Sequence, residues 1–177
     1  MGDAQDVSER REGSRRTTAP GAPAVILDGE AWKDVVQQEA ARWQRHGGSV
    51  AVLAVRLARR RGAPTAAGQP GDEAAGSGDP QAAERYAVPL GDVLRHRARA
   101  SDPVARVASD QFSVLLLEAD EAGASAYAER IRSICEPWVT AVPGDLALRI
   151  GWAVPGLGGS IQLAAEDAFA SVGTSSI

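Results

Sequence analysis

Residues 102–117 read Asp-Pro-Val-Ala-Arg-Val-Ala-Ser-Asp-Gln-Phe-Ser-Val-Leu-Leu-Leu, and this stretch decides the fold. Two short apolar runs lie on either side of a small polar turn, which is the pattern of two antiparallel strands joined as a hairpin. We expect these strands at about 103–107 and 112–118. The segments before and after the hairpin alternate between helical and extended patterns, and they define the rest of the sheet.

A helix and a buried strand are indicated near the start of the chain. Asp28 is suited to cap the helix, because its short side chain can accept from the free N–H groups of the first turn. Apolar residues recur at helical spacing from Trp32 until the Gly47-Gly48 pair ends the run. Residues 49–57 are few and rich in valine, which favours a strand buried on both faces.

Further helices lie on both sides of the hairpin. Residues 90–94 carry one apolar face of a short helix, with Pro89 as its first residue because the missing N–H is not needed there. After the hairpin, a helical pattern runs to Pro137. A strand at 146–154 and an amphipathic helix at about 161–172 complete the series.

After the first helix the order is strand, helix, strand, strand, helix, strand, helix. It is typical of an α+β fold with a ferredoxin-like βαββαβ core, in which helices cover one face of an antiparallel sheet. The 177 residues suit one domain, which we place at 24–172. Residues 1–22 are predicted to be a disordered tail and 62–82 a flexible loop, because neither carries periodic apolar residues, and 173–177 form a short tail.

Composition limits the compartment and the partners. The single cysteine, Cys135, excludes an internal disulfide, and no apolar run approaches the roughly 20 residues of a membrane-spanning helix. The first residues are polar and show no secretory signal. We therefore expect a cytoplasmic protein with no membrane partner. The net charge of −4 argues against a nucleic-acid partner.

Four segments of the chain carry a family resemblance. The first is the hairpin, with Asp102, Arg106 and Phe112 as its frame. The others are Ala-Glu-Arg-Ile-Arg at 128–132, Leu-Arg-Ile-Gly-Trp-Ala at 148–153 and Glu-Asp-Ala-Phe at 166–169. In this order they resemble the GGDEF-domain family of bacterial second-messenger signalling, whose members make cyclic di-GMP from two GTP. The family's nucleotidyl cyclase fold elaborates the ferredoxin-like unit, so the resemblance implies the same fold as the order of elements.

The resemblance also implies a degenerate site and an inactive relative of diguanylate cyclases. The family's reaction needs divalent cations held by carboxylates. Arg56 stands at the position of one such Asp, and Asp110 keeps the other, although a turn residue bonded to nearby backbone is an alternative role for it. Gly173 stands at the position of a phosphate-binding Lys, and Glu84 is the candidate for a guanine-binding Asp. The five signature positions are Ala108, Ser109, Asp110, Gln111 and Phe112.

One binding motif of the family is retained. Arg99-Ala-Ser-Asp102 matches the Arg-x-x-Asp inhibitory-site motif in its residues and in its distance from the signature. An Arg fork can bind a guanine edge or phosphate oxygens, while a carboxylate accepts from guanine N1 and N2. We therefore predict a non-catalytic domain, without a cofactor, in which Arg99 and Asp102 bind cyclic di-GMP. A solvated basic helix end is the alternative interpretation of this motif.

Two other functions stay open at this point. The fold could be a docking surface for a protein partner or another GGDEF domain, with the chain's four tryptophans as candidate contacts. A diguanylate cyclase with an altered active site is the third possibility. His46 and His96 stand apart from other potential ligands, so no metal site is expected at either histidine.

Overall fold

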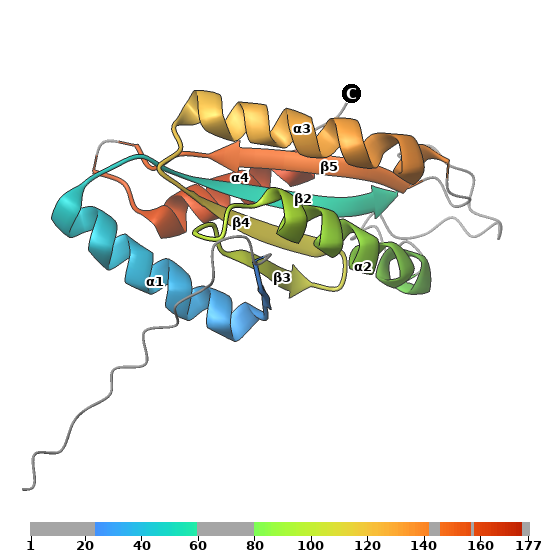
Figure 1. The fold of residues 1–177 in the computed structure, drawn as a ribbon, viewed down its shortest axis with the longest axis horizontal. Coiled ribbons are helices and arrows are strands. Elements are labelled where there is room, and N and C mark those ends of the chain that lie inside the picture. Colours follow the sequence, from blue (N-terminus) through green and yellow to red (C-terminus); the bar gives the residue numbers. More distant parts are fainter. Residues whose placement is uncertain (1–23, 60–79, 142–145, 157, 175–177) are drawn as a thin grey trace, which may run out of the picture.

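The computed structural model describes residues 24–59, 80–141, 146–156 and 158–174, which form one mixed sheet and four helices (Figure 1). In chain order the elements are β1 (Ile26–Leu27), α1 (Gly29–His46), β2 (Val50–Arg59), α2 (Pro80–Arg97), β3 (Val104–Ala108), β4 (Gln111–Leu117), α3 (Glu121–Thr140), β5 (Leu146–Ala153) and α4 (Ile161–Thr174). No helix in this part of the chain has the length and hydropathy needed to cross a membrane. Residues 1–22 and 62–79, for which we predicted a tail and a loop, lie outside the described residues.

β2 is the central strand of the sheet. The strand order is β1-β3-β4-β2-β5, and β2 pairs antiparallel with both β4 and β5. The side chains of residues 50–55 are 0–5% exposed, which confirms the prediction of a strand buried on both faces. In the ladder between β2 and β4, Val50 lies opposite Leu117 and Arg56 lies opposite Gln111. At the usual rise per residue these two pairs are about 20 Å apart, so each belongs to a different end of the sheet.

The predicted hairpin is confirmed as β3 and β4, which pair antiparallel with an irregularity between Arg106 and Ala108. Together with β2, α2, α3 and β5, the hairpin forms the ferredoxin-like βαββαβ order expected from the sequence. The α+β fold class is therefore confirmed.

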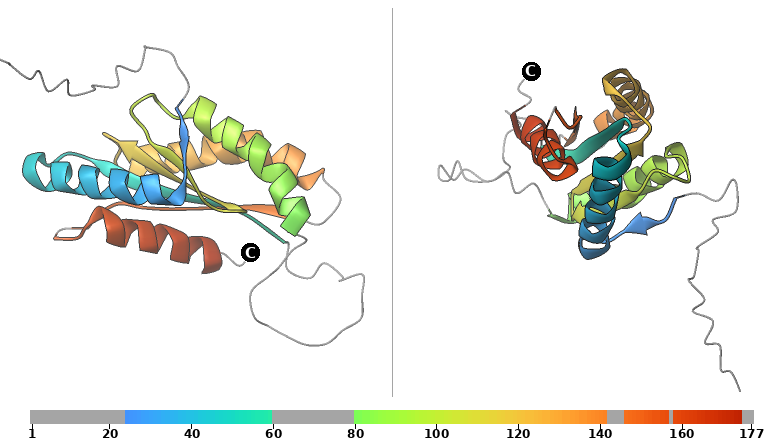
Figure 2. Two further views of the ribbon diagram at one scale, coloured as in Figure 1. Left: turned by 90° about the horizontal axis from the view of Figure 1, so that it is seen from below. Right: turned by 90° about the vertical axis from the view of Figure 1, so that its left-hand side faces the viewer.

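The helices pack in two layers, one on each face of the sheet (Figure 2). On one face, α2 and α3 cover alternate β2 residues that include Leu53 and Val55. On the other face, α1 and α4 cover the intervening residues Val50 and Val52, together with Leu115 of β4. This arrangement corrects the expectation of helices on one face only. The second face is also apolar, and α1 and α4, which flank the ferredoxin-like core in the sequence, bury it.

The sheet also differs from the expected antiparallel one at its edge. β1, which was not predicted, pairs parallel with β3 through Ile26 opposite Val104 and Leu27 opposite Ala105. A two-residue strand has no detectable alternation of apolar and polar side chains, so the pattern in the sequence could not reveal it.

Two prolines do not mark helix boundaries as predicted. α2 begins at Pro80 rather than Pro89, which lies inside the helix, and α3 continues past Pro137 to Thr140. The last residues of the predicted loop, 80–82, are therefore helical. A proline inside a helix removes one backbone hydrogen bond. In both helices, buried residues lie on either side of the proline; in α2 these include Ala87 and Leu90. The packing of these residues offsets the lost hydrogen bond.

The helix caps agree with the sequence. Asp28 Oδ1 accepts from the N–H groups of Glu30 and Ala31, at 3.1 and 2.8 Å, as predicted for the start of α1. Ser160 Oγ accepts from Leu163 N–H at 3.1 Å and caps α4. The starting residues of α1 and α4 are thus determined by local capping as well as by packing on the sheet.

Candidate functional site

One end of the sheet carries an ion pair between the two residues compared with metal-binding positions. Arg56 Nε donates to Asp110 Oδ2 at 3.0 Å, and the two side chains are 35% and 20% exposed. The register explains this contact, since Arg56 lies opposite Gln111 and Leu57 N–H donates to the Asp110 carbonyl at 3.0 Å. One oxygen of Asp110 therefore binds a residue of a distant strand, a contact that the alternative of a turn residue bonded to nearby backbone does not include.

Arg106 fixes the turn of the hairpin to α2. One of its terminal nitrogens donates to Glu84 Oε2 at 2.5 Å and to the Ser109 carbonyl at 2.6 Å. The guanidinium carbon lies 6.0 Å from the centroid of the Phe112 ring, which is 1% exposed. Glu84, the candidate guanine ligand, is thus already engaged by a cation. Arg106 and Phe112 are frame residues of the hairpin with clear structural roles.

At the other end of the sheet, Asp102 is a buried carboxylate that joins two segments. It is 3% exposed, and its oxygens accept from Arg99 N–H at 3.2 Å and Leu117 N–H at 3.1 Å. Burial raises the pKa of Asp102 above its usual range, although these two hydrogen bonds oppose the shift. Asp102 therefore holds the loop that carries Arg99 against the end of β4.

The Arg99 side chain borders a hollow of about 120 Å³ beside this loop. Arg97 and Arg130 border the same hollow, and among the described residues none of the three guanidinium groups lies within ion-pair distance of a carboxylate. Glu118 and Asp120 contribute carboxylates to its rim. The hollow thus offers unpaired guanidinium groups for anions and carboxylates for N–H donors.

Arg130 is a candidate binding residue that the sequence interpretation missed. It belongs to the Ala-Glu-Arg-Ile-Arg run, which was considered only as part of a helix. In the structure its guanidinium carbon lies 5.1 Å from the centroid of the Tyr127 ring, so that α3 presents it beside the loop of Arg99. The sequence does place Arg130 on the polar side of an amphipathic helix. Only the packing of α3 shows that this side chain lies beside the hollow bordered by Arg99.

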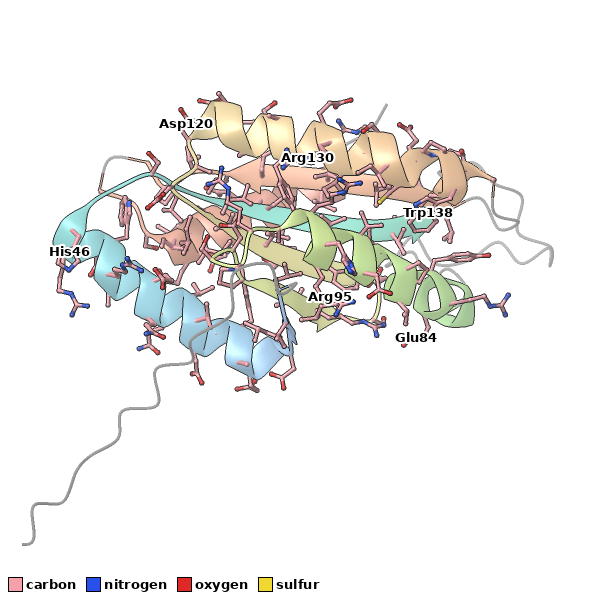
Figure 3. The ribbon with its side chains drawn as sticks, viewed as in Figure 1. His46, Glu84, Arg95, Asp120, Arg130 and Trp138 are labelled. Carbon is pink, nitrogen blue, oxygen red and sulfur yellow. The ribbon has the colours of Figure 1, made fainter. Side chains whose placement is uncertain are left out.

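The two ends differ in their chemistry. Figure 3 shows Asp120 and His46 toward one end of the molecule, and Glu84 and Trp138 toward the other. At the Glu84 end, each arginine described above is paired with a carboxylate. At the Asp120 end, no ion pair within the described parts of the chain engages the arginines of the hollow, so they can bind an external anion.

Comparison with solved structures assigns this architecture. A DGC protein from Thermotoga maritima superposes with a TM-score of 0.62 at 13% identity, over 84% of this chain and 96% of that one. The GGDEF domain of DgcB from Caulobacter crescentus, in complex with c-di-GMP, gives a TM-score of 0.61 at 13% identity, over 91% of both chains. The chain has the GGDEF-domain fold. The FimX GGDEF domain from Pseudomonas aeruginosa agrees, with a TM-score of 0.61 at 14% identity over 84% and 87%. No family model and no curated protein sequence matches the chain.

Within the GGDEF fold, the turn between β3 and β4 is the place of the signature. Ala108 and Ser109 are exposed there, and each adds a β-carbon that paired glycines would lack. Gln111 is partly buried in the ladder opposite Arg56. Gly173 lies in the last turn of α4, with no atom within 4 Å of where its Cβ would be. None of these side chains carries a charge that could bind a phosphate or a cation.

The residues present do not fit the divalent cations that the family's reaction requires. The Arg56 guanidinium already neutralises Asp110 from 3.0 Å, and a second cation at that oxygen would be repelled. The part of the chain that the structure describes also contains no group of three or more His, Cys, Asp or Glu residues able to hold a metal ion. The described residues of this site therefore do not support a metal-dependent step.

Proposed function

We propose that this protein is a non-catalytic domain of cyclic di-GMP signalling that binds the dinucleotide at the hollow bordered by Arg99. The contrast between the two ends of the sheet carries the proposal. The Arg56–Asp110 pair occupies the end where the family's chemistry takes place. Unpaired guanidinium groups gather at the opposite end. A domain of this kind would respond to the second messenger rather than make it.

The lack of catalysis follows from what joining two nucleotides requires. Two triphosphates carry several negative charges, which cations must neutralise before a hydroxyl can attack. At this site Arg56 supplies one positive charge, and it is already paired with Asp110. It can neither coordinate a hydroxyl nor deprotonate it, because a guanidinium remains protonated at physiological pH and has no free lone pair to donate.

The binding of a guanine dinucleotide follows from the mixed charges of the hollow. Arg99, Arg97 and Arg130 can donate to phosphate oxygens or to guanine O6 and N7, while carboxylates at the rim can accept from N1 and N2. Both oxygens of Asp102 already accept backbone N–H groups, so its main task in this proposal is to position Arg99. The solved complex of the DgcB domain with c-di-GMP supports the choice of ligand.

With GTP and Mg²⁺ or Mn²⁺, the purified protein is expected to form no cyclic di-GMP. The reason is the cation at position 56, which excludes the metal pair. Gln111→Glu alone should restore nothing, because the site lacks several parts that act together. Product formation is measured by chromatography after prolonged incubation. If the wild type formed cyclic di-GMP and Asp110→Ala did not, the site would be a working cyclase and this prediction would be wrong.

Arg99→Ala is expected to weaken cyclic di-GMP binding by a factor on the order of ten to a hundred while the fold stays intact. The substitution removes a charge-assisted hydrogen bond but leaves the backbone N–H that donates to Asp102. Calorimetric titration measures the affinities of both proteins. Arg85→Ala is the matched control, because Arg85 is exposed on the same helix as Arg97 but about 18 Å away from it along the axis. Equal affinities for the wild type and Arg99→Ala would exclude binding at this hollow.

A docking module for another protein is the second candidate. The diguanylate cyclase SiaD of Pseudomonas aeruginosa was solved in complex with its activator SiaC, and it superposes with a TM-score of 0.61 at 15% identity, over 83% of this chain and 54% of that one. That complex supports protein partners for this fold. If the wild type gives no heat with cyclic di-GMP at high micromolar concentration, this second candidate becomes the better one.

A further inference from the structure

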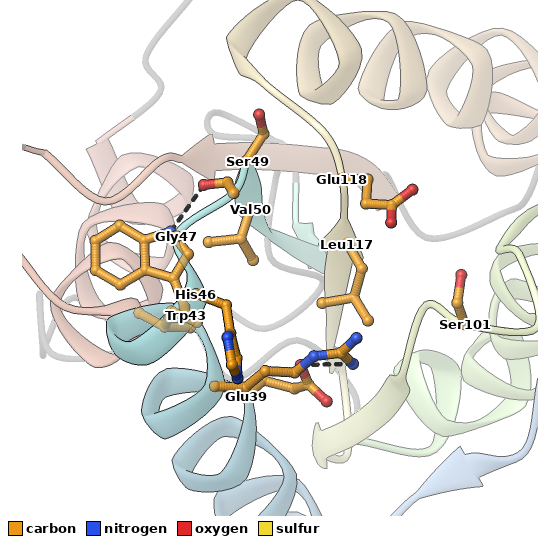
Figure 4. A pocket seen from close by; sticks show the side chains of 12 residues that line it. Glu39, Trp43, His46, Gly47, Ser49, Val50, Ser101, Leu117 and Glu118 are labelled. Carbon is orange, nitrogen blue, oxygen red and sulfur yellow. Dashed lines mark hydrogen bonds and ion pairs between the residues drawn. The ribbon is translucent and has the colours of Figure 1, made fainter.

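Three hollows adjoin one another at the Asp120 end of the sheet. The hollow bordered by Arg99 shares Leu117 and Glu118 with a larger cavity of about 420 Å³. That cavity shares Trp43 and Ser49 with a third hollow of about 170 Å³. The larger cavity lies between the C-terminal turn of α1 and the end of β4 (Figure 4). It is thus next to the proposed nucleotide site and separated from it only by the residues they share.

The size of the hollow bordered by Arg99 leaves most of a dinucleotide unplaced. Ligand pockets for drug-sized molecules have volumes of roughly 300–1,000 Å³. A cyclic dinucleotide, with two bases, two sugars and two phosphates, is at least drug-sized, whereas this hollow measures about 120 Å³. The neighbouring cavity of about 420 Å³ lies within the range. A bound dinucleotide would therefore extend beyond the arginines and reach this cavity.

One wall of the large cavity is a tryptophan fixed by the turn after α1. Trp43 Nε1 donates to the Gly48 carbonyl at 2.9 Å, and Gly47 N–H donates to the Trp43 carbonyl at 2.7 Å. Gly47 and Gly48 have φ values of 68° and 114°, which side chains other than glycine rarely allow. Trp43 is partly buried against the core, and the part of the ring that lines the cavity can stack on a base.

The opposite side of the cavity carries the carboxylate of Glu118. Figure 4 shows Glu118 across the cavity from Trp43, with Val50 and Leu117 between them as an apolar floor. Among the described residues no hydrogen bond or ion pair engages the Glu118 side chain. The carbonyl groups at the end of α1 add partial negative charge to the cavity. Arg42 of α1 also lines the cavity, and its Nη1 atom lies 3.8 Å from Glu39 Oε2.

The backbone at Glu118 is also unusual. Its φ of 56° is in the left-handed region, and it is the one residue other than glycine in the described parts of the chain with a positive φ. This conformation costs roughly 1–2 kcal/mol for a residue with a β-carbon, whereas glycine adopts it freely. Glycine would thus suit the backbone better at this position. The choice of glutamate points to a use for its side chain.

We propose that the cavity between Trp43 and Glu118 is a guanine subsite for the same cyclic dinucleotide. One base stacks on the Trp43 indole, and its N1 and N2 hydrogens are donated to the Glu118 carboxylate. The phosphates remain beside the guanidinium groups of Arg99 and Arg130. The inference rests on the proposed function, to which it adds the residues that select guanine.

Glu118→Gln tests the selectivity for guanine. Adenine does not present the paired N1 and N2 donors, so the wild type should bind cyclic di-GMP more tightly than cyclic di-AMP in calorimetric titrations. Glutamine keeps the shape of the side chain but loses its charge and one accepting oxygen. The substitution should therefore reduce the affinity for cyclic di-GMP about tenfold, and the difference in affinity between cyclic di-GMP and cyclic di-AMP should become smaller. Glu136→Gln, an exposed glutamate near the other end of α3, is the matched control and should change nothing.

Glu118→Gly separates binding from folding. Because glycine relieves the left-handed conformation, this variant should unfold at the same or a higher temperature than the wild type while its affinity for cyclic di-GMP falls. A loss of binding together with a loss of stability would indicate a structural role for Glu118 and overturn the assignment.

Trp43→Phe tests the stacking. Cyclic di-GMP should quench the tryptophan fluorescence of the wild type, and this quenching should be largely lost in Trp43→Phe. Trp138→Phe is the control, because Trp138 pairs with Tyr86 toward the opposite end of the molecule and should leave the quenching intact (Figure 3).

The outcomes distinguish the two proposals. If the wild type binds neither dinucleotide, the proposed function fails and the subsite fails with it. If cyclic di-GMP binds and Arg99→Ala weakens it, but Glu118→Gln and Trp43→Phe leave affinity, base preference and quenching unchanged, then only the guanine subsite is wrong.

Discussion

Phe112→Ala is expected to lower the free energy of unfolding by about 3–5 kcal/mol, which corresponds to a fall in Tm of roughly 6–20 °C for a domain of this size. The ring is 1% exposed in the core between the sheet, α2 and α3. α2 approaches it so closely at Gly91 that a Cβ there would lie 3.1 Å from the ring. Neighbours held at this distance cannot collapse into the space that alanine leaves. Thermal and urea unfolding followed by circular dichroism measure the loss.

Phe169→Ala is the matched control for this experiment. Phe169 is only partly buried, on α4, so its truncation should cost clearly less than that of Phe112. Phe112→Leu should also be milder, because it retains most of the apolar volume. If Phe112→Ala were no more harmful than Phe169→Ala, the ring would not be the core residue described above.

Gly151→Ala is expected to destabilise the protein by about 3 kcal/mol, at the upper end of the usual range for overpacking. A Cβ at position 151 would overlap the hydroxyl group of Ser171 and lie 2.6 Å from the Ala168 carbonyl oxygen. The serine can rotate, but the carbonyl belongs to the backbone of α4. The helix would have to move away from β5, and the contact between Ala54 and Ala168 would open with it. Chemical denaturation measures the change.

Gly173→Ala provides the comparison for Gly151→Ala. It makes the same substitution in α4, where no atom lies within 4 Å of the new Cβ and φ is not positive. Alanine favours helix over glycine, so this variant should be unchanged or slightly more stable. Similar effects of the two substitutions would contradict the close approach of α4 to β5.

The hairpin and the central strand could be predicted because their apolar residues follow one another without the spacing of a helix. Residues 50–58 of β2 and all of β4 are buried or partly buried, so valine and leucine occupy consecutive positions. The helix boundaries at Pro89 and Pro137 were wrong because proline is a local signal, and packing against the sheet outweighed it. The packing of α1 and α4 on the second face of the sheet depends on contacts between residues far apart in the sequence, which no local pattern contains.

The candidate site was only partly predictable, for a related reason. Arg56 and Asp110 were each compared with a metal position, but their contact requires the β2–β4 register. Arg130 joined Arg99 only through the packing of α3. Glu118 is a single polar residue after a strand. No pattern in the sequence predicts its left-handed backbone conformation or its position between two hollows. Binding of any nucleotide stays a prediction.

The Arg56–Asp110 ion pair also determines what a carboxylate at position 56 would encounter. A carboxylate at position 56 would lie near Asp110 without the Arg56 cation that now pairs with it. Two carboxylates so close together repel each other unless a cation lies between them. A metal ion between them would still leave Ala108, Ser109 and Gly173 in place. Under the proposed function, replacing Arg56 alone would therefore remove an ion pair without completing a metal site, so one substitution is not expected to produce a cyclase.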